Sequence, residues 1–195
     1  MRKGRLEAFS DGVIAIIITI MVLELKIPHG ADWEALRPVV PVFLTYVLSF
    51  VYLGIYWNNH HHMLYVTERV NGGILWANMH LLFWLSLIPF VTGWMGENHF
   101  APLPTAVYGA VLFAAATAYY TLQRLIIAQQ GADSKLKAAV GKDVKGKLSP
   151  LIYVAAIIMA FVNQWVSDGL YVLVALMWLI PDRRIEARVD EHAAR

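Results

Sequence analysis

Apolar residues run through this chain in long stretches that only short polar segments interrupt. A helix that crosses a lipid bilayer needs about 20 predominantly apolar residues, with about 17 to 25 tolerated. Six stretches approach this length, at residues 8–25, 38–57, 73–94, 102–122, 150–166 and 169–180. The pattern therefore predicts an all-α membrane bundle of six transmembrane helices, formed by one domain over residues 1–195.

Individual residues add detail to these helices. Pro38 and Pro41 fall in the first turn of the second stretch, where a missing N–H group costs little. Pro89 predicts a kink near the end of the third stretch. Only Ser167 and Asp168 separate the fifth stretch from the sixth, which predicts a tight helical hairpin at those two residues.

The basic residues predict the orientation, because cytoplasmic loops of membrane proteins are enriched in Lys and Arg. With the N-terminus inside, the predicted external segments hold only Lys26 and Arg37 of the 16 basic residues. A five-helix arrangement would place the basic C-terminal tail outside and spoil this asymmetry. We therefore predict a multi-pass protein of the cell membrane with both termini in the cytoplasm.

Three polar segments at the ends of the predicted helices bear on this topology. Residues 132–148 look like a soluble cytoplasmic linker that lies against anionic headgroups, and the charged tail 182–195 is predicted to be a helical extension. The basic N-terminus followed by an apolar run resembles a signal peptide. That run ends in Glu24-Leu25-Lys26 rather than in a small-residue cleavage site, so we expect the first helix to be retained.

Composition excludes several classes of protein. Hydrophobic residues make up 58% of the chain and charged residues 15%, against about half and about a quarter in a soluble domain. Lipid is therefore the expected solvent. The net charge of +2 is too small to indicate nucleic acid as a partner. Because the chain has no cysteine, disulfides, thiolate catalysis and Cys-ligated metals are excluded, and we expect no cofactor.

The first helix carries a stripe of residues that share one face at about 100° per residue. These residues are Gly12, Ile16, Thr19, Ile20, Leu23 and Ile27. One interpretation is a helix packed in a dry core, with Thr19 hydrogen-bonded to its own backbone. The other is a pore closed by rings of branched side chains, since hydrophobic constrictions gate by dewetting. The pore requires an oligomer, because one helix per subunit cannot enclose a path.

Polar residues precede this stripe. From their chemistry alone, Arg5 is a cytoplasmic anchor and Ser10 or Asp11 is an N-cap, although ionisable residues near a membrane also mark function. Arg5, Phe9, Ser10 and Asp11 form an Arg-x-x-x-Phe-Ser-Asp string. This string resembles the signature of the transmembrane protein 175 family, which comprises endosomal and lysosomal potassium channels and their prokaryotic homologues. Residues 57–61 and 76–90 look like that family's second and third helices.

The resemblance implies a homotetramer of six-helix subunits, with the first helix lining a potassium-selective pathway. By the same resemblance, Ile16 forms the narrowest ring, Thr19 contributes to selectivity and Leu23 forms another aliphatic layer. The signature residues would brace the first helix through polar contacts with neighbouring helices. The family uses no Thr-Val-Gly-Tyr-Gly filter, and this sequence contains none.

The histidines require separate interpretation. His60, His61 and His62 are consecutive, and adjacent residues on a helix point about 100° apart, so all three cannot bind one ion from one helix. Two of them could join His80 in a metal site. We favour hydrogen bonds at the cytoplasmic ends of the second and third helices, in which His60, His61, Trp76 and His80 give polar support without a metal.

These observations predict a potassium channel with a hydrophobic constriction. A secondary transporter is the main alternative, but the chain lacks a visible repeat and a charged residue in mid-membrane. An intramembrane enzyme would need a nucleophile–base pair or a His-Glu-x-x-His string, and neither is visible. The sequence therefore favours an ion-conducting protein that is not an enzyme.

Overall fold

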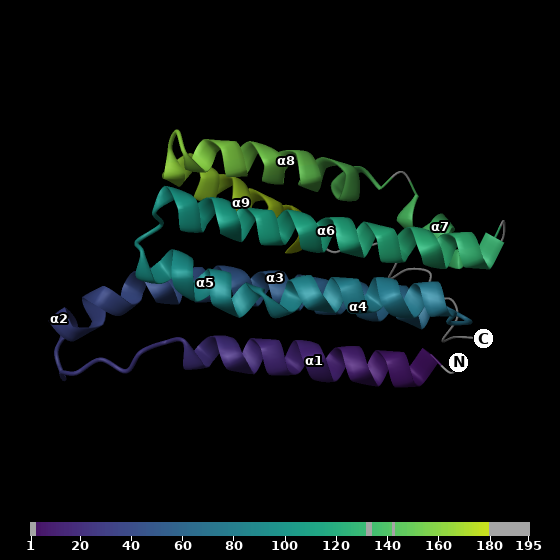
Figure 1. The fold of residues 1–195 in the computed structure, drawn as a ribbon, viewed down its shortest axis with the longest axis horizontal. Helices are drawn as coiled ribbons and strands as arrows, with labels where there is room; N and C mark the ends of the chain where they lie inside the picture. Colours follow the sequence, from purple (N-terminus) through teal and green to yellow (C-terminus); the bar gives the residue numbers. More distant parts are fainter. Residues whose placement is uncertain (1–2, 132–133, 142, 180–195) are drawn as a thin grey trace.

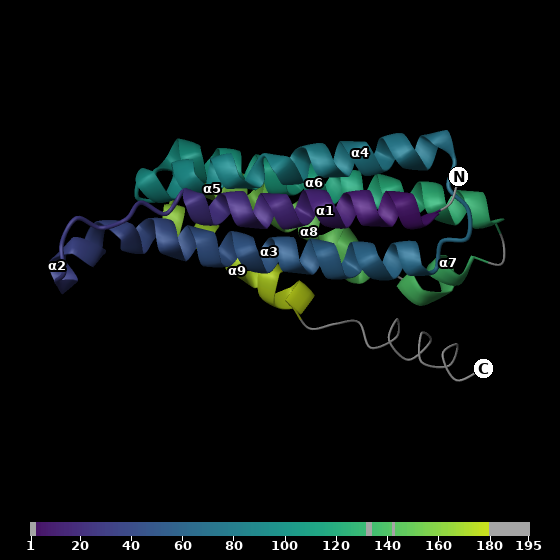
Figure 2. The same ribbon diagram turned by 90° about the horizontal axis from the view of Figure 1, so that it is seen from below.

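The computed structural model describes residues 3–131, 134–141 and 143–179, and every regular element in these ranges is helical. The main helices lie side by side along one axis and alternate in direction, except that α5 continues in the direction of α4 (Figure 1, Figure 2). They are α1 (Lys3–Leu23), α3 (Val40–Tyr65), α4 (Gly72–Ser86), α5 (Ile88–Glu97), α6 (Pro102–Gln130), α8 (Val144–Ala160) and α9 (Gln164–Leu179). The short ones are α2 (Trp33–Leu36), the 3₁₀ helix η1 (Arg37–Val39) and α7 (Lys135–Val140). The predicted all-α class is confirmed for this part of the chain.

Among the described residues, four helical segments are long and apolar enough to cross a membrane. They are Lys3–Leu23, Trp33–Tyr65, Gly72–Glu97 and Pro102–Gln130. The helix Gln164–Leu179 is apolar but shorter. Length and apolarity therefore support four spans directly, and the predicted fifth and sixth spans stay a prediction.

Capping side chains set several helix boundaries away from the predicted ones. Asn71 accepts a hydrogen bond from the backbone N–H of Ile74 at 2.9 Å and begins α4, while α3 continues to Tyr65 rather than ending at residue 57. Asp143 accepts from the N–H of Gly146 at 3.0 Å and begins α8 well before Pro150. Polar first and last turns extend these helices beyond their apolar cores, which is why apolar runs alone underestimate them.

The predicted hairpin at Ser167 and Asp168 is wrong. The chain turns at residues 161–163, and Ser167 and Asp168 lie within α9. The side-chain oxygen of Asn163 accepts from the backbone N–H of Trp165 at 3.1 Å and starts the new helix. The predicted linker 132–148 is also partly helical, since it holds α7 and the first turn of α8. The predicted tail helix at 182–195 lies outside the described residues.

The predicted kink at Pro89 is confirmed, because α4 ends at Ser86 and α5 begins at Ile88. A proline in a helix leaves the carbonyl four residues earlier without its backbone donor, which accounts for the break. Beyond the break, α5 packs tightly on α3. A Cβ atom on Gly96 would lie 2.6 Å from the Cα atom of Val42, so only glycine allows this approach.

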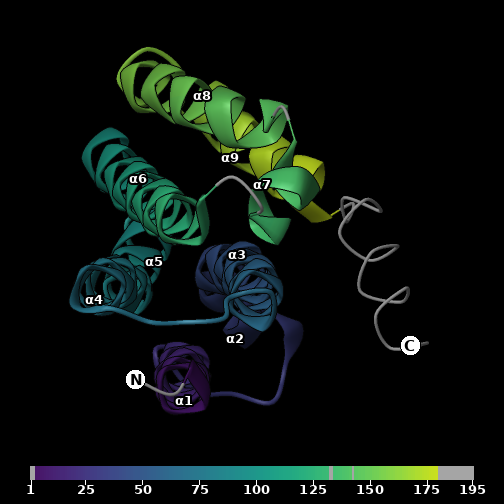
Figure 3. The ribbon, with the colours of Figure 1, turned by 90° about the vertical axis from the view of Figure 1, so that its right-hand side faces the viewer.

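The helices stack in layers when the bundle is seen end-on (Figure 3). One edge is α1, which packs against α3, α4 and α5; α6 lies in the middle, and α8 and α9 form the opposite edge. Hydroxyl pairs tie the middle together: Ser49 lies 2.6 Å from Thr92 and 3.0 Å from the hydroxyl of Tyr108. Because α1 sits at the edge, part of its surface is not covered by any of the other described helices.

Candidate functional site

The two faces of α1 differ sharply in burial. Leu6, Ser10, Ile14, Ile17 and Met21 recur every three or four residues and face the bundle. On the other face, the exposed fraction is 59% for Ile16 and 76% for Leu23. The remaining predicted stripe residues within the helix, Gly12, Thr19 and Ile20, are also exposed. The interpretation that this stripe packs in the chain's own core is therefore wrong.

Ile27 and Thr19 differ in their relation to the predicted stripe. Because α1 ends at Leu23, Ile27 lies in the following loop and does not extend the helical stripe. Thr19 donates its hydroxyl proton to the carbonyl of Ala15 at 2.8 Å, so the predicted bond to its own backbone is present. The result is an exposed, uncharged helix face whose one side-chain oxygen between Gly12 and Leu23 belongs to Thr19.

A buried chain of hydrogen bonds connects the buried face of α1 to two other helices. The hydroxyl of Ser10 donates to the carbonyl of Leu6 at 2.8 Å and accepts from the amide nitrogen of Asn78 at 3.0 Å. The amide oxygen of Asn78 lies 2.7 Å from Nε2 of His60. Since that oxygen can only accept, His60 carries its proton on Nε2. Ser10 in α1, Asn78 in α4 and His60 in α3 thus form one network.

The other signature residues lie around this network. Asp11 accepts a hydrogen bond from the indole N–H of Trp57 at 3.1 Å, so it faces α3. Arg5 is exposed and makes no hydrogen bond or ion pair to a described residue, and Phe9 is 51% exposed. α1 already begins at Lys3, so the expectation that Ser10 or Asp11 is an N-cap is wrong. Ser10 and Asp11 therefore make polar contacts with other helices, and their role in bracing α1 stays a prediction.

The histidines divide into separate environments. His60 is buried, whereas Nδ1 of His61 lies 3.9 Å from the Glu7 carboxylate at the surface, a pair that forms when His61 is protonated. His80 accepts from the indole N–H of Trp84 at 2.9 Å and takes no part in the Ser10 network. Trp76 is 78% exposed. No group of three metal-ligating side chains occurs in the parts of the chain that the structure describes.

A groove with acidic and apolar walls lies beside the C-terminal half of α1, at the end of the bundle where α2 lies. It has a volume of about 630 Å³ and is lined by α1 residues including Ile16 and by α5 residues including Phe90, with Glu24 and Glu97 at its end. Lys26 forms an ion pair with Glu97 at 2.5 Å. The hydrogen bond to Glu97 and the charge of that carboxylate raise the pKa of Lys26.

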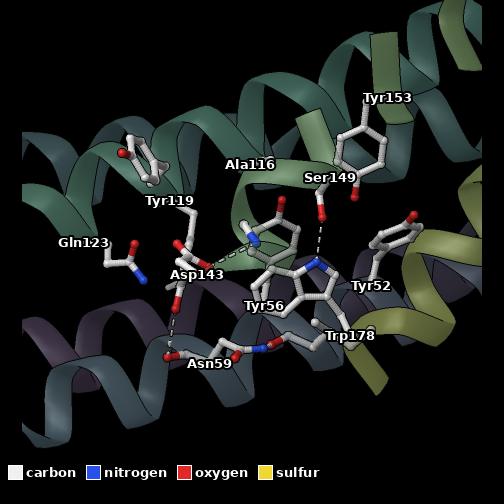
Figure 4. Close-up of a pocket in the computed structure, with 13 residues that line it drawn as sticks. Tyr52, Tyr56, Asn59, Ala116, Tyr119, Gln123, Asp143, Ser149, Tyr153 and Trp178 are labelled. Carbon is white, nitrogen blue, oxygen red and sulfur yellow. Dashed lines mark hydrogen bonds between the residues drawn. The ribbon is translucent and has the colours of Figure 1, made fainter. Parts of the chain in front are cut away.

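A second cavity is rich in aromatic side chains and lies elsewhere. Its walls come from α3, α6, α8 and α9 and include Tyr56, Tyr119, Tyr153 and Trp178 (Figure 4). No residue of α1 lines it. End-on, α6, α8 and α9 lie on the other side of α3 from α1 (Figure 3). The cavity is therefore separate from the exposed face of α1.

Known proteins identify the family. A family model described as the endosomal/lysosomal potassium channel TMEM175 matches residues 5–89. A potassium channel of Chryseobacterium sp. (strain P1-3) is 55% identical over 192 residues, which cover 98% of this chain and 100% of the relative. The chain belongs to the TMEM175 family. The resemblance predicted from Arg5 to Asp11 is thus confirmed.

Other TMEM175 proteins place the fold in the same family. The crystal structure of a lysosomal potassium-selective channel TMEM175 homolog from Chamaesiphon minutus matches with a TM-score of 0.78 at 26% identity, over 92% of this chain and 97% of that chain. The endosomal/lysosomal proton channel TMEM175 of Gallus gallus is 41% identical over 81 residues, which are 35% of this chain and 16% of the relative. The shared fold thus extends over nearly the whole chain, while the match to the Gallus gallus protein covers about a third of it.

Asn78 is the functional-site residue that sequence reasoning missed. Its amide is buried and bridges Ser10 and His60, so it completes the bracing of α1. It was visible as an amide side chain inside an otherwise apolar, uncharged stretch. Such a group in lipid needs a partner, because an unpaired polar group there costs several kcal/mol.

Proposed function

We propose that this chain is a potassium-selective channel of the cell membrane, formed by four copies arranged around α1. The exposed face of α1 carries the proposal. An aliphatic stripe interrupted by one hydroxyl is left uncovered by the chain's own helices, while the opposite face is fixed by the Ser10–Asn78–His60 network. Membership of the TMEM175 family and the names of the relatives support the same function.

In this arrangement Ile16, Thr19 and Leu23 face the ion. Ile16 and Leu23 are seven residues apart, so their side chains form two aliphatic rings separated by about 10 Å along the helix. The Thr19 hydroxyl lies between them. Aliphatic constrictions restrict ions by dewetting, which replaces the ring of backbone carbonyls used by other potassium channels.

The orientation proposed from the basic residues fits the arrangement of the helices. The N-terminal end of α1 and α7 lie at one end of the bundle, and α2 lies at the other (Figure 1). Lys26 and Arg37, the two basic residues assigned to the outside, flank α2 in the sequence. We propose six spans, with α8 and α9 as the last two and both termini in the cytoplasm.

Flux from purified protein in lipid vesicles tests the channel. We expect potassium to pass much faster than sodium, without saturation at low concentration and without a proton gradient. Absence of potassium flux would reject the channel. Saturable flux that depends on a proton gradient would favour the secondary transporter, and a proton current without potassium current would favour a proton channel.

The variant Ile16→Asn tests the constriction. A polar side chain should wet the narrow ring, so we expect the ratio of potassium to sodium flux to fall several-fold. Ile158 offers a matched control, because it is 60% exposed on α8, away from α1. Ile158→Asn should leave selectivity unchanged. Equal selectivity in Ile16→Asn and the parent protein would remove Ile16 from the constriction.

A further inference from the structure

Most serine and threonine hydroxyls in these helices have a hydrogen-bond partner, and two buried ones do not. Serine and threonine in a helix often donate to the carbonyl three or four residues earlier. Seven residues in the described helices do so: Ser10, Thr19, Thr45, Ser86, Thr117, Thr121 and Ser149. The hydroxyls of Thr105 and Ser167 are fully buried and have no hydrogen-bond partner among the described residues.

The carboxylate oxygens of Asp168, the residue after Ser167, also lack hydrogen-bond partners among the described residues. Both of these oxygens are buried. The ion pairs formed by the described residues do not include Asp168. Buried carboxylates are normally paired or bound to a cation, because an isolated buried charge is very costly.

These three residues lie near the starts of α6 and α9, two helices that contact each other. The hydroxyl of Tyr171 donates to the backbone carbonyl of Thr105 at 3.0 Å. Side chains in a helix lean toward its N-terminus, so the Tyr171 side chain passes over Ser167 on its way to Thr105. Asp168 directly follows Ser167 near the start of α9. Thr105, Ser167 and Asp168 therefore share one small region.

We propose that Thr105, Ser167 and Asp168 form a binding site for a monovalent alkali cation between α6 and α9. Two carboxylate oxygens and two hydroxyl oxygens are the hard ligands that such ions prefer. One carboxylate neutralises one monovalent charge, whereas a divalent ion would leave a buried positive charge. The bound ion would join the first turns of α6 and α9 and stabilise their packing. Asp168 belongs to α9, so this site is distinct from the exposed face of α1.

Thermal unfolding of the detergent-solubilised protein tests the site without measuring flux. Melting temperatures are compared in sodium, potassium and N-methyl-D-glucamine chlorides of equal ionic strength. At a salt concentration about ten times the Kd, one site should raise the Tm by about 3–6 °C over N-methyl-D-glucamine. A Tm that does not depend on the cation would overturn the proposal.

The variant Asp168→Asn separates this site from every other cation effect. We expect it to lose the alkali-cation response and to be more stable than the parent protein in N-methyl-D-glucamine, because it removes a buried charge without a partner. A response that persists in Asp168→Asn would assign the stabilisation to another place, such as the conduction path, and reject the site. The outcome is independent of whether the channel conducts.

Two threonines on α6 provide a matched pair. Thr105→Val should weaken the alkali-cation response, whereas Thr117→Val should preserve it, because the Thr117 hydroxyl already donates to the carbonyl of Phe113. Equal responses in the two variants would count against Thr105 as a ligand.

Infrared spectra distinguish a proton bound to Asp168 from a bound metal ion. A protonated-carboxyl band at neutral pH that vanishes in Asp168→Asn would show that Asp168 holds a proton, which would overturn the cation proposal.

Discussion

Two isoleucines two positions apart in α1 lie in opposite environments. Ile14 is 1% exposed and packs in the bundle core, whereas Ile16 is 59% exposed on the outer face of the same helix. The buried face also carries the hydroxyl that bonds to Asn78, while the outer face carries the hydroxyl that bonds to its own backbone. One face of α1 therefore packs within the subunit, and the opposite face is available to other molecules.

The largest effect should come from removing the buried isoleucine. Ile14→Ala leaves a cavity in a packed core and should lower the free energy of unfolding by about 2–5 kcal/mol. Ile16→Ala makes the same chemical change on the exposed face, where we expect less than about 1 kcal/mol. Unfolding in denaturing detergent measures both. Similar losses in the two variants would contradict the assignment of the two faces.

A smaller effect should follow from breaking the polar network. Asn78→Leu leaves Nε2 of His60 buried without a partner, which should cost about 1–3 kcal/mol. Asn98→Leu is the control, because the exposed Asn98 amide bonds only to its own helix, at the carbonyl of Trp94. If both variants unfold alike, the Asn78 bridge does not hold α1 in place.

The smallest effect concerns the partly exposed contact of Asp11. Trp57→Phe removes the 3.1 Å hydrogen bond to Asp11 and should cost about 0.5–1.5 kcal/mol. Trp76 is 78% exposed and donates no hydrogen bond to a described residue, so Trp76→Phe makes the same change without that loss. The difference between the two melting curves gives the contribution of the Asp11 contact. No difference would mean that Asp11 does not brace α1 through Trp57.

The exposed face of α1 could be predicted from sequence because helical periodicity needs no tertiary information. Ile16, Thr19 and Leu23 fall on one face in any α-helix, and the structure leaves that face exposed. Their role in conduction stays a prediction. The bracing role of Ser10 and Asp11 was predicted from resemblance, and the structure supplies its partners, Asn78 and Trp57.

Turns between apolar helices were harder to predict than the helices themselves. Phe161 and Val162 are apolar, so the hydrophobic pattern continues through the true turn, and the polar pair Ser167–Asp168 resembled a turn. Asn163 was the available signal, since asparagine is a strong N-cap. Partners across helices, such as Asn78 for His60, depend on the rotation of each helix, which apolar stretches do not specify.

The hydrogen bond from Thr19 to Ala15 has a consequence for the sign of the charge that the exposed face attracts. The hydroxyl proton of Thr19 is already donated, at 2.8 Å, to a carbonyl of its own helix. Its oxygen therefore presents only lone pairs to the outside, and a lone pair attracts a cation and repels an anion. A threonine whose hydroxyl proton is donated within its own helix thus presents an oxygen that favours a cation over an anion, without any charged residue beside it.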